Sequence, residues 1–206
     1  MAFIRTIPVE EATGEVRALY ERSQASAGYI PNYAKVFSHR PEVMAAWSAL
    51  LASIRGNLET RQYELITLAA ARALRSSYCM LAHGRVLREK FYSAAQLTAI
   101  AADFARADLT PAEVAMMSFA ERVARDATTI TDAEVRSLRE HGFTDAQVFD
   151  IAAAAAARCF FSKLVDALGA LPDAGFGQLE DDLKRELTPG RPISTESPER
   201  MPPAPP

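Results

Sequence analysis

The chain has 206 residues, of which 49% are hydrophobic and 24% charged, and its formal net charge is -3. This composition is typical of a folded globular protein and argues against wholesale disorder, while the length suits one domain or two small fused ones. With 23 basic and 26 acidic residues, the chain lacks the basic excess of a general nucleic-acid-binding protein.

No apolar run approaches the roughly 20 residues of a membrane-spanning helix, and the first ten residues lack a signal-peptide core. We therefore expect a cytoplasmic protein without a membrane partner. Two cysteines, Cys79 and Cys159, are too few for a disulfide framework or a structural zinc site. The chain also has no glycine-rich phosphate loop, so the sequence indicates neither a metal nor a nucleotide cofactor.

Helical patterns follow one another along the chain, and no segment shows the sustained alternation of a β-strand. The sequence therefore predicts an all-α helical bundle. The expected helices cover residues 9–26, 31–38, 41–55, 60–75, 77–91, 93–103, 111–126, 132–141, 145–169 and, as a short one, 178–187. The proline-rich tail after them has almost no apolar residues and is expected to be disordered.

Several helices are expected to begin with a capping box, in which a Ser or Thr and a Glu or Gln three residues later satisfy backbone N–H groups. The boxes are Ser93–Gln96, Thr110–Glu113, Thr131–Glu134 and Thr144–Gln147. A weak echo between the segments around the first and last boxes favours two related helical units; chance reuse of one capping solution is the alternative. The expected division is N-terminal helices over 1–41, units over 42–105 and 106–170, a short helix within 171–187 and the tail over 188–206.

Three residues that carry chemistry interrupt apolar helix faces, so their side chains are expected to point inward. Cys79 and His83 are four residues apart on one helix and lie on the same face. Glu64 interrupts the apolar stripe of the preceding helix, about 7 Å along the axis from the level of His83 in a tight hairpin. An imidazole can take the proton of a thiol, whose anion is the nucleophile, and a carboxylate can fix the imidazole tautomer and support its protonated form.

The spacing of these residues resembles the signature of the alkylhydroperoxidase D-like, or carboxymuconolactone decarboxylase-like, superfamily. In its peroxidase branch, a Glu is followed twelve residues later by Cys-x-x-Cys-x-x-x-His. Glu64, Cys79 and His83 match this spacing without a gap, Tyr78 fits the position before the second cysteine, and Ser76 replaces the first cysteine.

Flanking segments extend the resemblance over about residues 5–170, as in two-unit, peroxidase-related members of the superfamily. These segments are Ile30-Pro-Asn-Tyr, His39-Arg-Pro-Glu-Val, Leu109-Thr-Pro-Ala-Glu and Leu138-Arg-Glu-His-Gly-Phe-Thr-Asp. The resemblance implies an alkylhydroperoxidase D-like helical fold and a homo-oligomer with the site in or near a subunit interface.

By this resemblance, Cys79 is the peroxide-reducing thiol, and His83 and Glu64 form the proton relay that generates its thiolate. Ser76 and Tyr78 support the site, and the hydroxyl of Ser76 can donate a hydrogen bond to the thiolate. Attack of the thiolate on the O–O bond leaves a sulfenic acid. The leading hypothesis is therefore a peroxiredoxin-type oxidoreductase, an antioxidant enzyme that reduces hydroperoxides with a single reactive cysteine.

The serine at the first cysteine position cannot form the disulfide that resolves the sulfenic acid in the peroxidases. The cycle then needs an external thiol reductant; Cys159, which lies in the other unit, is a less favoured resolver. One alternative is a decarboxylase- or isomerase-type enzyme that uses His83 and Glu64 as acid and base on a small carboxylated or lactone substrate. Another is a non-catalytic oligomeric module that binds a ligand.

Overall fold

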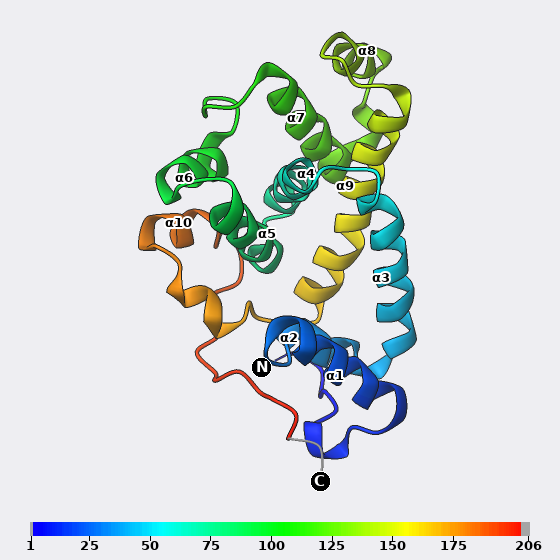
Figure 1. The fold of residues 1–206 in the computed structure, drawn as a ribbon, viewed down its shortest axis with the longest axis vertical. Helices are drawn as coiled ribbons and strands as arrows, with labels where there is room; N and C mark the ends of the chain where they lie inside the picture. The colour runs from blue at the N-terminus through cyan, green and yellow to red at the C-terminus, as the bar shows by residue number, and fades with distance from the viewer. Residues whose placement is uncertain (1, 203–206) are drawn as a thin grey trace.

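The computed structural model describes residues 2–202, in which helices are joined by short loops (Figure 1). The α-helices are α1 (Gly14–Ala27), α2 (Asn32–Val36), α3 (Pro41–Arg55), α4 (Thr60–Ala73), α5 (Ser77–Lys90), α6 (Ala94–Asp103), α7 (Pro111–Asp126), α8 (Asp132–Glu140), α9 (Asp145–Ala167) and α10 (Asp181–Glu186). Short 3-10 helices are η1 (Val9–Glu11), η2 (Phe37–His39), η3 (Ala127–Thr129) and η4 (Ala174–Gln178). The described residues contain no β-strand, which confirms the all-α prediction, and none of their helices has the length and apolarity to span a bilayer.

The helix starts follow from local capping chemistry. At Ser93, Thr110 and Thr144, the predicted boxes close in both directions, because each hydroxyl accepts from the backbone N–H three residues on while that residue's side chain accepts in return. At Thr131, the backbone N–H donates to the Glu134 carboxylate. The first predicted helix is wrong at its start: η1 is separated from α1, since the backbone is extended at Thr13.

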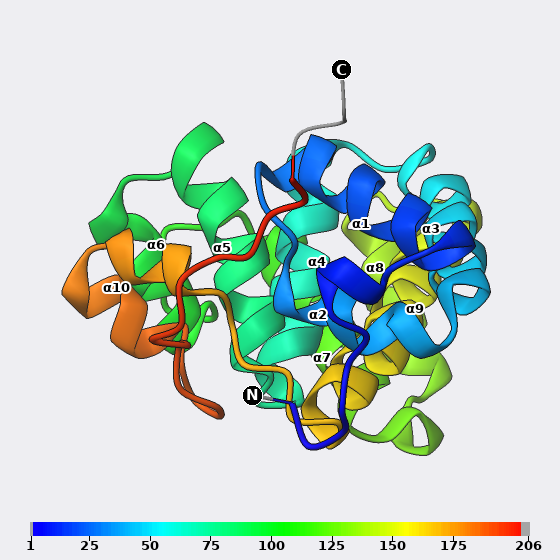
Figure 2. The same ribbon diagram turned by 90° about the horizontal axis from the view of Figure 1, so that it is seen from below.

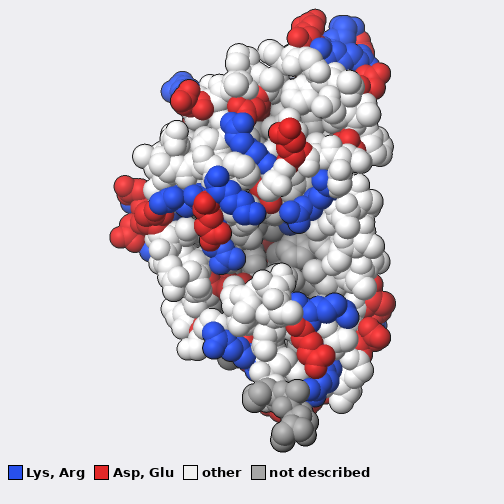
Figure 3. Space-filling view, viewed as in Figure 1, with Lys and Arg blue, Asp and Glu red and all other residues white. Residues whose placement is uncertain are grey.

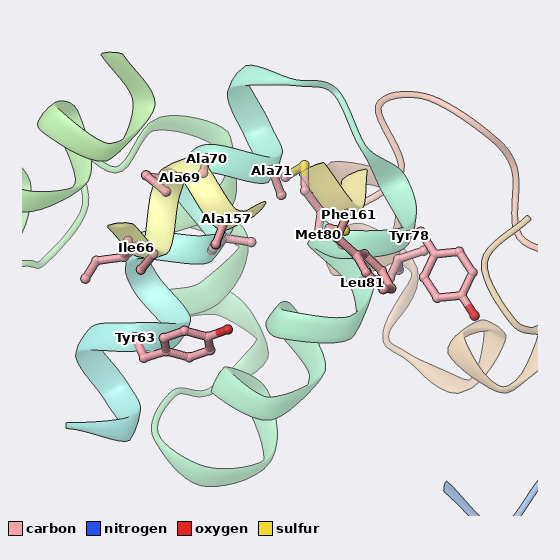
Figure 4. Close-up of a cluster of buried hydrophobic side chains, with 14 of the residues drawn as sticks. Tyr63, Ile66, Ala69, Ala70, Ala71, Tyr78, Met80, Leu81, Ala157 and Phe161 are labelled. Atoms are coloured by element: carbon pink, nitrogen blue, oxygen red, sulfur yellow. The ribbon is translucent and has the colours of Figure 1, made fainter. Parts of the chain in front are cut away.

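Helix α4 lies in the middle of the bundle and packs against α5, α7 and α9 (Figure 2). All residues from Tyr63 to Ala71 are buried. Small side chains allow this close approach: Ala69 and Ala70 of α4 lie beside Ala157 of α9 (Figure 4). A single hydrophobic cluster therefore joins the two helical units expected from the sequence, and side chains of both units can meet in one site.

The proline-rich tail is not disordered over the residues that the structure describes. Its residues 188–202 run along the bundle, and the Gly190 backbone N–H donates to Ser77 Oγ at 2.8 Å (Figure 2). Near its end, Met201 is buried. Proline excludes a helix here but leaves an extended chain able to pair its remaining backbone groups and to bury isolated apolar side chains. Residues 203–206 lie outside the described residues.

Candidate active site

The side chains of Glu64, Cys79 and His83 lie where α4, α5 and α9 pack together. Glu64 is 3% exposed in the centre of α4, and Cys79 is 1% exposed in the first turn of α5. One turn further along α5, the His83 side chain keeps 14% of its surface exposed. Figure 3 shows the molecular surface hollowed over α9, between α5 and α3. The site is therefore almost closed, with the imidazole as its more accessible group.

The imidazole of His83 is paired with the carboxylate of Glu64. Nδ1 lies 2.5 Å from Oε2, so the long Glu side chain spans the offset expected from the helical hairpin. Burial lowers the pKa of His83, as does the charge of Arg158, and these effects outweigh Glu64, which raises it. Glu64 therefore supports the protonated imidazole, as expected, but burial and the charge of Arg158 prevail, and the imidazole is neutral at neutral pH. With Nδ1–H donating to Glu64, Nε2 carries the lone pair and can act as a base.

The thiol of Cys79 receives its hydrogen bonds from α9. Ser162 Oγ donates to Sγ at 3.1 Å, and Arg158 Nη1 lies 3.6 Å from Sγ. These two donors are four residues apart and share one face of α9. Within residues 2–202, no hydrogen bond joins Cys79 to His83. Both donors favour the anionic form of the sulfur, one of them with a full positive charge.

Arg158 is only 4% exposed and has an unusual set of contacts for a buried cation. Its Nη2 lies 3.4 Å from the Tyr63 hydroxyl, and its guanidinium lies over the rings of Trp47 and Phe161, at 5.9 and 5.5 Å from their centroids. Burial disfavours the charge, but Cys79 and Tyr63 raise the pKa of Arg158. No carboxylate of the described residues forms an ion pair with it, and Nε has no hydrogen-bond partner there.

Sequence reasoning missed Arg158 and Ser162, although a signal was present. Both interrupt a stripe of α9 that is otherwise buried and apolar, formed with Ala154, Phe161 and Val165. The same pattern singled out Glu64 on α4. On α9, Arg158 and Ser162 lie in a long alanine-rich helix, and their distance in sequence from Cys79 follows no recognisable motif.

The two predicted supporting residues do not contact the thiol by hydrogen bond. Ser76 is fully buried at the N-cap of α5, and the hydroxyl that donates to Sγ is that of Ser162 instead. Tyr78 points toward the C-terminal segments, where its hydroxyl donates to Asp173 Oδ2 at 2.5 Å (Figure 4). Burial and the Asp173 charge raise the pKa of Tyr78 well above its usual value. Tyr78 therefore anchors α5 to the C-terminal region.

The second cysteine faces a different helix. Cys159 follows Arg158 directly, so its side chain is rotated by about 100° around α9. Its sulfur lies 3.4 Å from the carbonyl oxygen of Ala155 and 4.0 Å from that of Ala124 on α7. Burial raises the pKa of this thiol. An intramolecular disulfide between Cys79 and Cys159 would require α9 to rotate. No group of three His, Cys, Asp or Glu side chains in the described part of the chain is placed to hold a metal ion.

One protein family matches the part of the chain that contains Glu64, Cys79 and His83. The profile of the carboxymuconolactone decarboxylase family matches residues 41–122, which include Glu64, Cys79 and His83 but neither Arg158 nor Ser162. No curated protein sequence matches the chain.

Solved structures share the fold over most of their length. An uncharacterized peroxidase-related protein with an alkylhydroperoxidase AhpD core, from Ralstonia eutropha JMP134, is 28% identical with a TM-score of 0.76, covering 85% of this chain and 94% of that one. A peroxidase-related protein from Silicibacter sp. TM1040 is 22% identical with a TM-score of 0.71, covering 85% and 91%. The debrominase Bmp8, solved as a cysteine-to-alanine variant with 2,3,4-tribromopyrrole, is 16% identical with a TM-score of 0.65, covering 84% and 89%.

Proposed function

Because residues 41–122 form a carboxymuconolactone decarboxylase family domain in an alkylhydroperoxidase D-like fold, we propose that this chain is a thiol-dependent hydroperoxide reductase. Cys79 is the nucleophile, and His83 with Glu64 moves the proton. The main support is the buried Cys79 thiol, which accepts hydrogen bonds from a guanidinium and a hydroxyl beside a paired imidazole and carboxylate. These groups favour a reactive anion and supply a base next to it.

The reaction begins with attack of the Cys79 thiolate on the distal oxygen of the hydroperoxide. An S–O bond forms, the O–O bond breaks, and the sulfur loses two electrons to the departing alkoxide. Neutral His83 takes the proton of the hydroperoxide at Nε2 and passes it to the alkoxide. The products are a sulfenate on Cys79 and an alcohol, or water when the substrate is hydrogen peroxide. Atoms and charge balance without a further proton.

Restoration of the thiol requires a reductant of the low-molecular-weight or protein thiol class. After protonation, the sulfenic acid condenses with one such thiol, releasing water and forming a mixed disulfide; a second thiol then displaces Cys79. The serine at position 76 cannot substitute for this external thiol, and Cys159 faces α7.

A direct test is to expose the protein to hydrogen peroxide or an organic hydroperoxide with dimedone and to locate the adduct by mass spectrometry. We expect Cys79 to be labelled, Cys159 to be unlabelled, and Cys159→Ser to behave like the unchanged protein. Brominated pyrroles belong in the same substrate panel, since the debrominase of similar fold binds one. A Cys79 that reacts no faster than a free model thiol at the same pH contradicts the proposal.

A second candidate, acid–base catalysis on a small carboxylated or lactone substrate, is favoured by the His83–Glu64 pair, which can work without the thiol. It predicts that Cys79→Ser keeps turnover of such a substrate and that His83→Gln loses it. The reductase predicts that Cys79→Ser loses peroxide turnover. If both variants change only the melting temperature and no turnover is found, the chain is a ligand-binding module instead.

The functional assembly that we propose is a homo-oligomer. The side chains of Leu50, Phe149 and Phe160, on the neighbouring helices α3 and α9, are exposed. Apolar side chains gathered on one face favour association with another subunit. Analytical ultracentrifugation tests this: the unchanged chain should sediment as an oligomer and Phe149→Ser more slowly, whereas a monomeric unchanged chain contradicts it.

A further inference from the structure

The contacts of Arg158 extend the proposed function, on which this inference rests. We propose that Cys79 is held as a thiolate by Arg158 as its counterion, while His83 stays neutral and handles only the proton of the substrate. Arg158 on α9 would thus stabilise the nucleophile, and His83 on α5 would transfer the proton of the substrate. A pairing of thiolate with a protonated His83, the usual alternative, would place both tasks on one imidazole.

The buried guanidinium of Arg158 carries a charge that needs a counterion. An arginine side chain stays protonated in proteins, and a buried charge without a counterion is costly. Glu64 is engaged with His83 at 2.5 Å, and no other carboxylate of residues 2–202 forms an ion pair with Arg158. Two of the groups that Arg158 contacts can ionise, Cys79 and Tyr63. A thiol is intrinsically a stronger acid than a phenol, and the sulfur also receives the Ser162 hydroxyl, so we assign the counterion role to Cys79.

The groups around Arg158 and Cys79 fix the geometry of this pair. The rings of Trp47 and Phe161 lie on the guanidinium, so they hold it in place and exclude water from it. Ser162, one turn further along α9, adds a hydroxyl donor to the same sulfur. Cys79 also lies in the first turn of α5, where backbone N–H groups favour a negative charge. The guanidinium, the Ser162 hydroxyl and the helix N-terminus each favour an anionic sulfur and oppose the cost of its burial.

Other titratable and charged groups surround the thiol. On α4 these are Glu64 and Tyr63, on α5 His83, and at the end of α3 Arg55, whose charge lowers the pKa of His83 together with burial and Arg158. A neutral imidazole cannot be the counterion of a thiolate. It keeps a lone pair on Nε2, which suits it to carry a proton between the two oxygens of the substrate.

The test compares Arg158→Met with His83→Gln in a Cys79-only background, Cys159→Ser. Alkylation of Cys79 by iodoacetamide is followed against pH by mass spectrometry, together with thiolate absorbance near 240 nm and without peroxide. We expect Arg158→Met to move the midpoint of the rate profile upward by about one pH unit or more, which is about a tenfold slower reaction at low pH. Arg158→Lys should restore part of the reactivity, and Arg136→Met, an exposed site on α8, should change nothing.

The same profile for His83→Gln separates the two pairings. We expect its midpoint to stay where it is in the unchanged protein, while the reaction of that variant with peroxide is slowed. A midpoint that moves in His83→Gln and not in the Arg158 variants overturns the proposal, and so does a profile in the unchanged protein that follows the titration of an imidazole. If Arg158→Met fails to fold, Arg158→Lys and His83→Gln still distinguish Arg158 from a protonated His83 as the counterion of the thiolate. A low midpoint without any sulfenic acid would leave the ion pair standing and contradict only the reductase function.

Discussion

The two walls of the site differ in how their residues are spaced along the chain and in the charge they carry. Glu64 and His83, on α4 and α5, are 19 positions apart and form a pair that is neutral on the imidazole side. Arg158, on α9, is 79 positions from Cys79 and brings a fixed positive charge against it. In the mechanism that we propose, the first wall moves protons and the second stabilises an anion. On this proposal, α9 would stabilise the anion of a single buried thiol, while α4 and α5 would carry the proton of its substrate.

The largest effect that tests this division is loss of the nucleophile itself. Cys79→Ser should lower peroxide turnover by on the order of 10³ or more, because a hydroxyl is a far weaker nucleophile than a thiolate. The melting temperature should change little, since the two side chains are similar in size. Steady-state peroxide consumption with a dithiol reductant measures the effect, with Cys159→Ser as the matched control. Equal losses in both cysteine variants would refute the assignment of Cys79.

The next effect isolates the proton-moving wall. His83→Gln should lower kcat with peroxide by about a hundredfold, within the usual range for loss of a general acid–base group. The alkylation rate of Cys79 should stay within about threefold, since that reaction needs no proton relay. Single-turnover peroxide reduction and iodoacetamide alkylation are measured side by side. If His83→Gln slows peroxide reduction and alkylation equally, proton transfer and thiolate stabilisation are not separated between the two walls.

A smaller effect belongs to the neutral donor on the α9 wall. Ser162→Ala removes a hydroxyl that donates to Sγ at 3.1 Å, and a neutral hydrogen bond contributes about 1 kcal/mol, or roughly fivefold in a rate or equilibrium. The alkylation rate of Cys79 at low pH should fall by that factor, less than for Arg158→Met. Ser48→Ala, on the exposed side of α3, is the control. If Ser162→Ala has a larger effect than Arg158→Met, the guanidinium is not the main stabilising group.

The same contrast explains how much the sequence could predict. Helix positions and capping boxes depend on local residue patterns, and most of them are correct. The burial of Glu64 and Cys79 and the pairing of Glu64 with His83 could be expected, because two adjacent helices hold these residues at a short, regular spacing. Arg158 was not, because its position depends on how α9 packs against α4 and α5 across the core. The ordered C-terminal segment was missed for a related reason: the contacts that hold it on the bundle, such as that of Gly190 with Ser77, are made with distant parts of the chain.

A further effect concerns stability, not rate, and comes from the lowered pKa of His83. In the unfolded chain His83 titrates near pH 6.5, and in the folded chain at a lower pH, since burial and Arg158 oppose its charge. Between these two values the unfolded state binds more protons, so the free energy of unfolding falls as pH drops below about 6.5 and is fully retained above it. The slope contributed by this one group cannot exceed about 1.4 kcal/mol per pH unit. Urea denaturation at pH 7.5 and 5.5 should show this loss in the unchanged protein and a smaller one in His83→Gln; equal losses would mean that His83 is not held neutral by the fold.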